Sequence, residues 1–345
     1  MLEAAAATPA GPSPLDAATR ELLARAAHLE KHPLARLVSL VEREGEEART
    51  RRAALFRFLR DHEAEYRPRA RVVGITGTPG AGKSSLIGRV ALECFAGDAH
   101  MRIAVLAIDP SSAESGGALL GDRLRTHFPV GERRIFFRSQ ATQGDLGGMG
   151  RRTFAVTRLL RHLFDLVFVE TVGIGQSEIE ITRVADLVVL VMQPLAGDHV
   201  QFLKAGIMEV PDVFVINKCD EEALARRSAH ELRAALAYAK VGGPSADAHH
   251  LFQTSATTGR GVPELAAFLR SGAVRPHGRA GRHAQEVYFL RKAVAERWGR
   301  FGTDEAGRAL AALPPAVRAA ATYEELEAVV LAAIARRIRR PASEV

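Results

Sequence analysis

The chain has 345 residues, with 47 basic and 40 acidic side chains that give a formal net charge of +7. Hydrophobic residues make up 47% of the chain and charged residues 25%, proportions typical of a soluble globular protein whose core needs no disulfide bonds. The arginines are scattered and no aromatic-rich nucleic-acid motif accompanies them, so we expect a solvated basic surface and no nucleic-acid partner. No apolar run approaches the length of a membrane span, so we expect no membrane partner either.

Cysteine usage and the N-terminus both indicate a cytoplasmic protein. The two cysteines, Cys94 and Cys219, lie far apart and have no metal-ligand spacing, which suits a reducing compartment. Residues 1–15 are rich in Ala, Pro and Gly and lack the basic start and apolar core of a signal peptide. We therefore expect a disordered lead-in at 1–15.

Residues 16–68 predict an N-terminal helical arm. Apolar residues recur at helical spacing from Leu22 to Leu29, in a second run from Pro33 through Val41, and in a third run from Glu46 to Tyr66.

Residues 69–272 predict the core domain, an α/β fold. Short, almost continuous apolar runs alternate there with helical segments, a pattern that indicates a mostly parallel sheet with helices on both faces. The expected strands are 71–76, 102–108, 134–138, 165–171, 186–192, 212–217 and 250–254. Parallel strands place their ligand-binding loops at the carboxyl ends, and the motifs below all follow strands.

The first expected strand leads into a complete phosphate-binding loop between a strand and a helix. Its residues are Gly77, Thr78, Pro79, Gly80, Ala81, Gly82, Lys83 and Ser84, and we add Ser85 to the nucleotide-binding set. The glycines let backbone N–H groups converge on a polyphosphate at the positive end of a helix. Lys83 is expected to reach the β and γ phosphates, and the Ser84 hydroxyl to hold Mg²⁺.

A second motif selects the base. Asn217, Lys218 and Asp220 follow the sixth expected strand. An Asp carboxylate can accept hydrogen bonds from the ring N–H and the exocyclic amine of guanine, whereas adenine offers no such donor pair. We expect Asn217 to brace the loop and the Lys218 stem to cover the base. Ser255 and Ala256, after the last strand, are expected to present a backbone N–H to the guanine carbonyl.

Three acids stand where hard oxygen ligands for Mg²⁺ are needed: Asp109, Asp122 and Glu170. Gly173 is expected to contact the γ phosphate through its backbone. Because hydrolysis releases that contact, the loop 170–178 is expected to act as a switch. We expect Lys83, Glu170 and Gly173 to be the catalytic residues. Ile174 occupies the position where Ras-type enzymes carry a water-orienting Gln, so we expect slow intrinsic GTP hydrolysis. The role of nearby Gln176 stays open.

Residues 273–345 predict a helical extension, with helices at 284–300 and 322–340. Thr322 and Glu325 form a capping box, and an apolar stripe at Leu326, Val330, Ile334 and Ile338 follows. The stripe suits packing on its own domain or on a second subunit. Whether the basic cluster at 336–340 has a partner stays open.

The whole set resembles the MeaB/ArgK family of P-loop GTPases, the chaperones of adenosylcobalamin-dependent acyl-CoA mutases. The motifs at 77–84, 109–122, 170–178 and 217–220 carry the resemblance, which covers about residues 20–340. It implies GTP and GDP as ligands, Mg²⁺ as cofactor, and a homodimer that uses the C-terminal helices. It also implies that the protein gates cofactor loading and protects or reactivates a mutase, either methylmalonyl-CoA mutase or one acting on another branched acyl-CoA.

The segment 194–206 departs from the family's commonest pattern, which leaves the identity of the mutase open. The glycine-rich stretch 143–150 is either a close-approach turn or a partner-contact loop. A GTPase metallochaperone is the alternative function, although it would call for Cys and His metal ligands. A small-molecule kinase would need an acceptor pocket with a general base, and none is evident.

Overall fold

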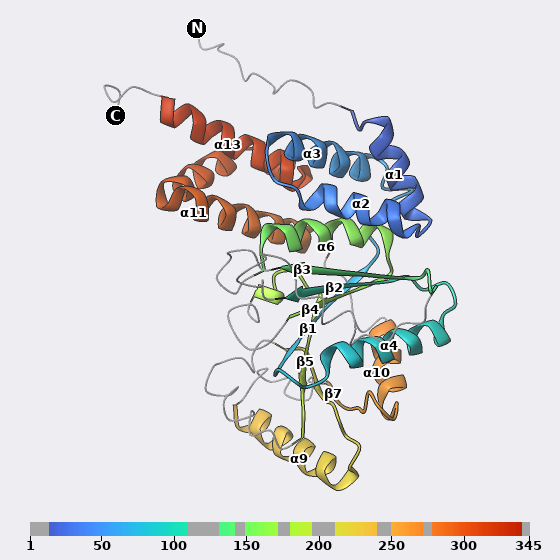
Figure 1. Cartoon of the computed structure of the whole chain (residues 1–345). Coiled ribbons are helices and arrows are strands. Elements are labelled where there is room, and N and C mark those ends of the chain that lie inside the picture. The colour runs from blue at the N-terminus through green and yellow to red at the C-terminus, as the bar shows by residue number, and fades with distance from the viewer. Residues whose placement is uncertain are drawn as a thin grey trace, which may run out of the picture. The chain divides into compact units, whose positions relative to one another are not determined.

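The computed structural model describes residues 14–109, 131–141, 149–171, 180–194, 211–239, 250–271 and 278–339. The chain divides into two compact units, Arg69–Pro276 and a helical unit that combines Met1–Pro68 with His277–Val345 (Figure 1). Several expected features lie outside the described residues, namely most of the lead-in at 1–15, the stretch at 143–148, and 195–206.

In the described part of the Arg69–Pro276 unit, seven strands form one parallel sheet in the order β3-β2-β4-β1-β5-β6-β7. The strands are β1 Arg71–Gly77, β2 Ile103–Asp109, β3 Ile135–Ala141, β4 Leu166–Glu170, β5 Leu187–Met192, β6 Val213–Ile216 and β7 His250–Gln253. Each matches an expected strand to within a few residues. Near-continuous apolar runs form these strands because both faces of the sheet are buried.

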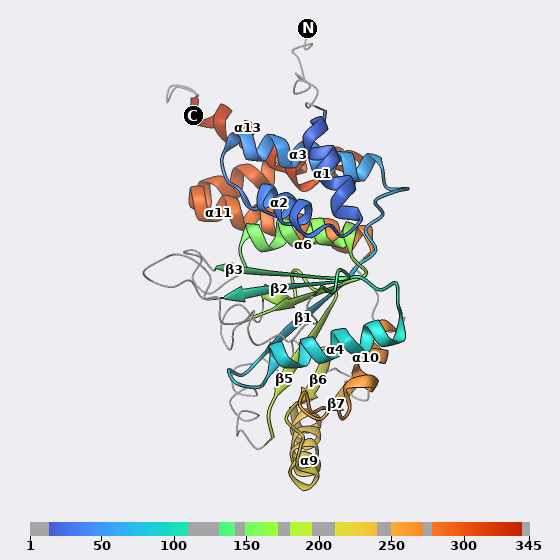
Figure 2. The same cartoon turned by 45° about the vertical axis from the view of Figure 1, so that its right-hand side comes forward.

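Helices cover both faces of the sheet, which confirms the expected α/β class (Figure 2). Helices α4 (Lys83–Gly97) and α10 (Val262–Arg270) pack side by side over alternate strand residues such as Val73, Val189 and Val213. Helix α9 (Glu222–Ala239) packs on the opposite side, against Leu190 and Phe214. Helix α6 (Arg151–Leu163) lies across the sheet from α4. The loops at the carboxyl ends of the strands are thereby held on a rigid support.

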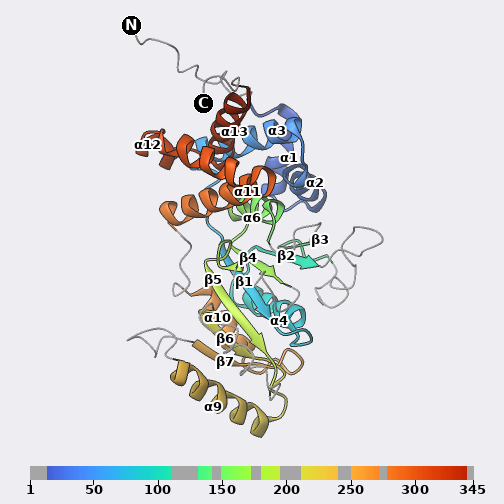
Figure 3. The same ribbon diagram turned by 90° about the vertical axis from the view of Figure 1, so that its left-hand side faces the viewer.

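The helical unit contains, within its described residues, α1 Ala17–Ala27, α2 Lys31–Glu42, α3 Glu46–Asp61, α11 Arg279–Ala311, α12 Pro315–Ala320 and α13 Tyr323–Arg339 (Figure 3). The sequence predicts two separate helical extensions, but α3 and α13 pack together. The Glu325 carboxylate accepts hydrogen bonds from Arg57 Nε at 3.1 Å and Arg60 Nη1 at 2.7 Å. Buried Arg52 faces buried Glu324, with 3.6 Å between Nε and Oε1.

The C-terminal helices differ in detail from the expectation. Thr322 and Glu325 form the expected capping box, with reciprocal hydrogen bonds of 2.8 and 3.3 Å. Helix α11 extends beyond residue 300 to Ala311. Its helical backbone is interrupted by a kink at Gly299 (φ 57°, ψ −145°) and then resumes. The last member of the apolar stripe, Ile338, is 62% exposed. Among the described helices, none combines the length and the apolar character needed to span a membrane.

Candidate functional site

The phosphate-binding loop links β1 to α4, as its sequence predicts. Gly82 has a left-handed backbone (φ 82°), and a Cβ atom there would lie 2.7 Å from Asn217 Nδ2. A Cβ atom at Gly77 would lie only 1.9 Å from the carbonyl oxygen of Val191. Glycine is therefore required at both positions, by backbone conformation at Gly82 and by the close approach of β5 at Gly77.

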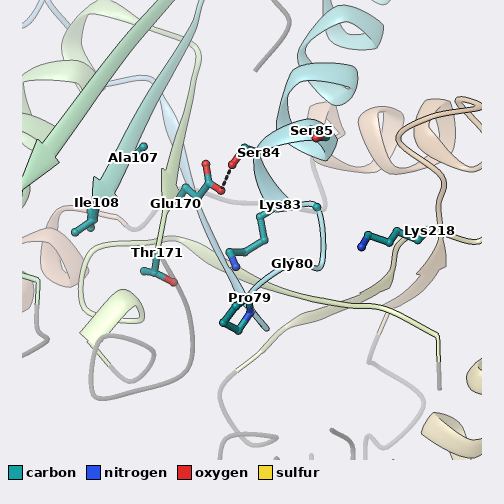
Figure 4. Close-up of a pocket in the computed structure, with 11 residues that line it drawn as sticks. Pro79, Gly80, Lys83, Ser84, Ser85, Ala107, Ile108, Glu170, Thr171 and Lys218 are labelled. Atoms are coloured by element: carbon teal, nitrogen blue, oxygen red, sulfur yellow. Dashed lines mark hydrogen bonds between the residues drawn. The ribbon is translucent and has the colours of Figure 1, made fainter. Parts of the chain in front are cut away.

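Lys83 and Ser84 begin α4 and project beside Glu170 (Figure 4). Lys83 is only 7% exposed, and its Nζ donates to the carbonyl oxygens of Gly77 at 2.9 Å and Thr78 at 3.0 Å. Ser84 Oγ donates to Glu170 Oε1 at 2.7 Å. The lysine ammonium is thus held at the mouth of the loop, where a phosphate chain would replace the carbonyl oxygens as its partners.

A cavity of about 420 Å³ opens at this edge of the sheet. Its lining includes Lys83 and Ser84 from α4, Glu170 and Thr171 from the end of β4, and Lys218 after β6. Figure 4 shows Glu170 and Lys218 on either side of the phosphate loop. The remaining lining residues are Pro79, Gly80, Gly82, Ser85, Ala107 and Ile108. The size is that of a small-ligand site, and the sequence motifs from three strands converge on it.

The magnesium ligands can be tested against the chemistry of the donors. The Ser84 hydroxyl and the 5%-exposed Glu170 carboxylate are hard oxygen donors within hydrogen-bond distance of each other, which fits Mg²⁺. The other expected ligands cannot be compared in this way. Asp109 ends β2, but its side chain is not among those described, and Asp122 lies outside the described residues. Gly173 and Gln176 lie in 172–179, also outside them.

Asn217 joins the phosphate loop to the two loops expected at the base. Its Nδ2 donates to the carbonyl of Ala81 at 2.8 Å, while its Oδ1 accepts from Thr254 Oγ1 and from the backbone N–H of Ala256, each at 3.2 Å. Asn217 is 1% exposed. An amide is suited to this position because it donates on one side and accepts on the other.

Asp220 is exposed, and one of its carboxylate oxygens accepts a 2.7 Å hydrogen bond from Ser255 Oγ. Between Asn217 and Asp220, Lys218 adopts a positive φ of 63°, an uncommon conformation for a residue with a side chain. Cys219 is buried, and burial raises the pKa of its thiol. The loop thus presents Lys218 and Asp220 outward and anchors itself with Asn217 and Cys219.

Two further polar residues, which the sequence motifs did not single out, lie at the carboxyl ends of the strands. Gln193 Oε1 accepts a hydrogen bond from Lys218 Nζ at 3.2 Å, and Thr171 Oγ1 donates to Thr76 Oγ1 at 3.0 Å. Each follows a buried apolar strand directly, as Gln193 follows β5 and Thr171 follows β4. The same signal that singles out Glu170, a polar side chain at a strand's carboxyl end, could have found both.

Comparison with family models matches residues 34–299 to the family described as methylmalonyl Co-A mutase-associated GTPase MeaB. A Pyrococcus horikoshii protein named as a GTPase is 39% identical over 251 residues, which are 71% of this chain and 74% of that protein. The mouse methylmalonic aciduria type A homolog, named as mitochondrial, is 37% identical over 203 residues, covering 56% of this chain and 46% of its own. The match therefore spans less than half the length of the mouse relative.

Among solved structures, the crystal structure of a LAO/AO transport system kinase matches 95% of this chain and 100% of its own, with 25% identity and a TM-score of 0.57. The residues matched to the family include the phosphate loop, all seven described strands of the sheet and the loop that carries Asn217 and Asp220. This chain therefore belongs to the MeaB family of methylmalonyl-CoA mutase-associated GTPases, and it is a P-loop GTPase.

Proposed function

We propose that this GTPase is a chaperone of an adenosylcobalamin-dependent acyl-CoA mutase, which it serves by gating cofactor loading and by protecting or reactivating the mutase. The nucleotide-binding part of the proposal rests on the network around Asn217, which joins the loop that carries Asp220 to the phosphate loop. The family description and the name of the mouse relative support a mutase, with methylmalonyl-CoA mutase as the first candidate.

Guanine selection is proposed to depend on Asp220. Guanine presents two N–H donors on one edge, and a carboxylate has enough lone pairs to accept both while keeping the hydrogen bond from Ser255. Adenine would leave that acceptor pair without donors, which is an effective means of rejection. Lys218 is proposed to cover the base, and the Ala256 backbone N–H to be shared between Asn217 Oδ1 and the guanine carbonyl.

The phosphates are proposed to lie against the loop Gly77–Ser85, with Lys83 on the β and γ phosphates. Ser84 and Glu170 would hold Mg²⁺, directly or through water, together with Asp109 and Asp122. When bound, Mg²⁺ would neutralise negative charge on the phosphates. Ser84 and Lys83 bind and orient the nucleotide, and Gly173 is proposed to contact the γ phosphate through its backbone.

We further propose that intrinsic hydrolysis is slow and depends on the partner. The residue after Gly173 is Ile174, which cannot orient water as a glutamine does. Slow hydrolysis suits a timing role, since the GTP-bound state then lasts long enough for a partner to be engaged. The proposal also includes a homodimer that uses the C-terminal helices, and a cytoplasmic location, which the two buried free cysteines suit.

The test is nucleotide-dependent association with a mutase. Purified protein should form a complex with methylmalonyl-CoA mutase on size-exclusion chromatography, and the dissociation constant should differ between GDP and a non-hydrolysable GTP analogue. Isothermal titration with nickel serves as the control for the metallochaperone alternative. Tight nickel binding together with no mutase association in any nucleotide state would refute the chaperone proposal.

A further inference from the structure

Two buried threonines connect the strand that leads into the phosphate loop with the strand that carries Glu170. Strands β1 and β4 run parallel, with Ile75 opposite Glu170, so Thr76 and Thr171 follow side by side. Thr171 Oγ1 donates to Thr76 Oγ1 at 3.0 Å, and the Thr171 backbone N–H donates to the carbonyl of Ile75 at 3.0 Å. Thr76 is 0% exposed and Thr171 is 1% exposed.

The position of this pair links it to the cavity. Thr171 lines the cavity beside Glu170, and the Glu170 carboxylate accepts the hydrogen bond from Ser84 (Figure 4). The residue that immediately follows Glu170 is therefore held by a backbone hydrogen bond and by its hydroxyl, which lies 3.0 Å from Thr76 Oγ1 and 3.5 Å from the carbonyl oxygen of Ile75. Holding that residue at two points restricts the rotation of the backbone at the strand end, and so restricts the direction of the Glu170 side chain.

We propose that Thr171 is a positioning residue for the magnesium centre, and that it acts through its hydroxyl bond to Thr76 by keeping the Glu170 carboxylate directed at the Ser84 hydroxyl. The inference rests on the proposed magnesium role of Glu170 and deepens it. Without the hydroxyl bond, the end of β4 is free to shift, and the carboxylate meets the metal in its productive position for a smaller fraction of the time.

Isosteric substitutions test the proposal. Thr171→Val and Thr76→Val each remove one hydroxyl and keep the shape, so the apparent Mg²⁺ concentration needed for half-maximal stabilisation of bound GDP should rise about 3- to 10-fold in both. Thr171→Ser, which keeps the hydroxyl, should restore the wild-type Mg²⁺ dependence.

Thr157→Val is the matched control. Thr157 is also 1% exposed in the same unit, and its hydroxyl donates to the carbonyl of Thr153 at 2.8 Å within α6. It should lose stability to a similar extent without any change in Mg²⁺ dependence. A purely structural role for the Thr171 hydroxyl would give all three valine variants the same profile, with lower melting temperature and unaltered Mg²⁺ dependence, and that result would overturn the proposal.

A measurement without nucleotide or metal separates this proposal from the one on which it rests. In the nucleotide-free, metal-free protein, Thr76→Val should accelerate hydrogen exchange of the Thr171 amide about 3- to 10-fold, while Thr157→Val leaves it unchanged. Unaltered exchange would overturn the positioning role. If exchange rises but Glu170→Gln leaves the Mg²⁺ dependence of GDP binding intact, the magnesium role of Glu170 fails and the hydroxyl pair stands as a backbone anchor only. Either valine variant alone carries the test if the other does not fold.

Discussion

Asn217 Nδ2 donates a 2.8 Å hydrogen bond to the carbonyl oxygen of Ala81, although the two residues are 136 positions apart. The same side chain accepts the backbone N–H of Ala256 through its Oδ1. One buried amide therefore connects the phosphate-binding loop, the loop that carries Asp220 and the loop that carries Ser255. We therefore expect this side chain to couple the binding of a base to the binding of a phosphate chain.

Asn217→Ala should weaken GDP binding by about 10- to 100-fold, because it leaves the Ala81 carbonyl and the Ala256 N–H without their partner. Fluorescence titration with a labelled GDP measures the change. Thr258→Ala is the control, since it removes an exposed side chain from the same loop, and should change the affinity less than about twofold. An affinity within about twofold of wild type for Asn217→Ala would contradict the coupling.

Lys83→Ala should abolish measurable binding of GTP and GDP. The ammonium is 7% exposed and placed at the mouth of the phosphate loop, and no other cation among the described lining residues is held in this position. Isothermal titration measures the loss, and circular dichroism establishes that the variant is folded. Tight GTP binding by a folded Lys83→Ala protein would refute the assignment of the phosphate loop.

Glu170→Gln should weaken the Mg²⁺ dependence of GDP binding and slow GTP hydrolysis. The amide keeps an acceptor for the Ser84 hydroxyl but lacks the charge that attracts a divalent cation. Single-turnover hydrolysis at several Mg²⁺ concentrations measures both effects. The rate should fall about 10-fold or more on loss of one charged oxygen ligand or water-holding group. Wild-type rates at every Mg²⁺ concentration would remove Glu170 from the site.

Asp186→Ala should lower the free energy of unfolding of the Arg69–Pro276 unit by about 3–5 kcal/mol, because it leaves a buried guanidinium without its charge partner. Arg161 and Asp186 form an ion pair of 2.8 Å in which the side chains are 5% and 0% exposed. Chemical denaturation measures the change. Arg227→Ala breaks the exposed pair with Glu231 and should cost less than about 1 kcal/mol. Equal costs for the two variants would contradict this account of the buried pair.

The sheet could be predicted strand by strand because its strands are buried on both faces. Each therefore appears in the sequence as a short apolar run, such as Leu187–Met192, and the polar residues that end the runs mark the ligand edge. The phosphate loop and the Asn217 loop are local motifs whose chemistry is readable from their own residues. These parts needed no knowledge of which strands are neighbours.

The remaining features depend on contacts between distant segments. The hydroxyl pair of Thr76 and Thr171 exists only because β1 and β4 are neighbours in the sheet, an order that the separate strand patterns do not state. The packing of α3 on α13 includes hydrogen bonds from Arg57 and Arg60 to Glu325, and in the sequence these three residues look like ordinary surface charges. Short α12 (Pro315–Ala320) has no buried residue and therefore no apolar period to reveal it.

We propose that a guanine nucleotide, recognised by Asp220, governs association with a mutase. Asp220→Asn should keep one acceptor for the ring N–H and replace the other by an N–H donor. Because xanthine has a carbonyl oxygen where guanine has its exocyclic amine, the preferred base should change from guanine to xanthine. Ser255→Ala is a useful companion variant, because it removes the 2.7 Å hydrogen bond to Asp220 without altering the carboxylate. It should weaken guanine binding modestly and leave the preference for guanine intact.

The most direct measurement is therefore mutase binding by the Asp220→Asn protein in four nucleotide states: GDP, a non-hydrolysable GTP analogue, and the two corresponding xanthine nucleotides. We predict that the complex with methylmalonyl-CoA mutase responds to the xanthine pair and no longer responds to the guanine pair at concentrations that control the wild type. Mutase binding that still follows the guanine nucleotides, or that ignores all four, would contradict the account.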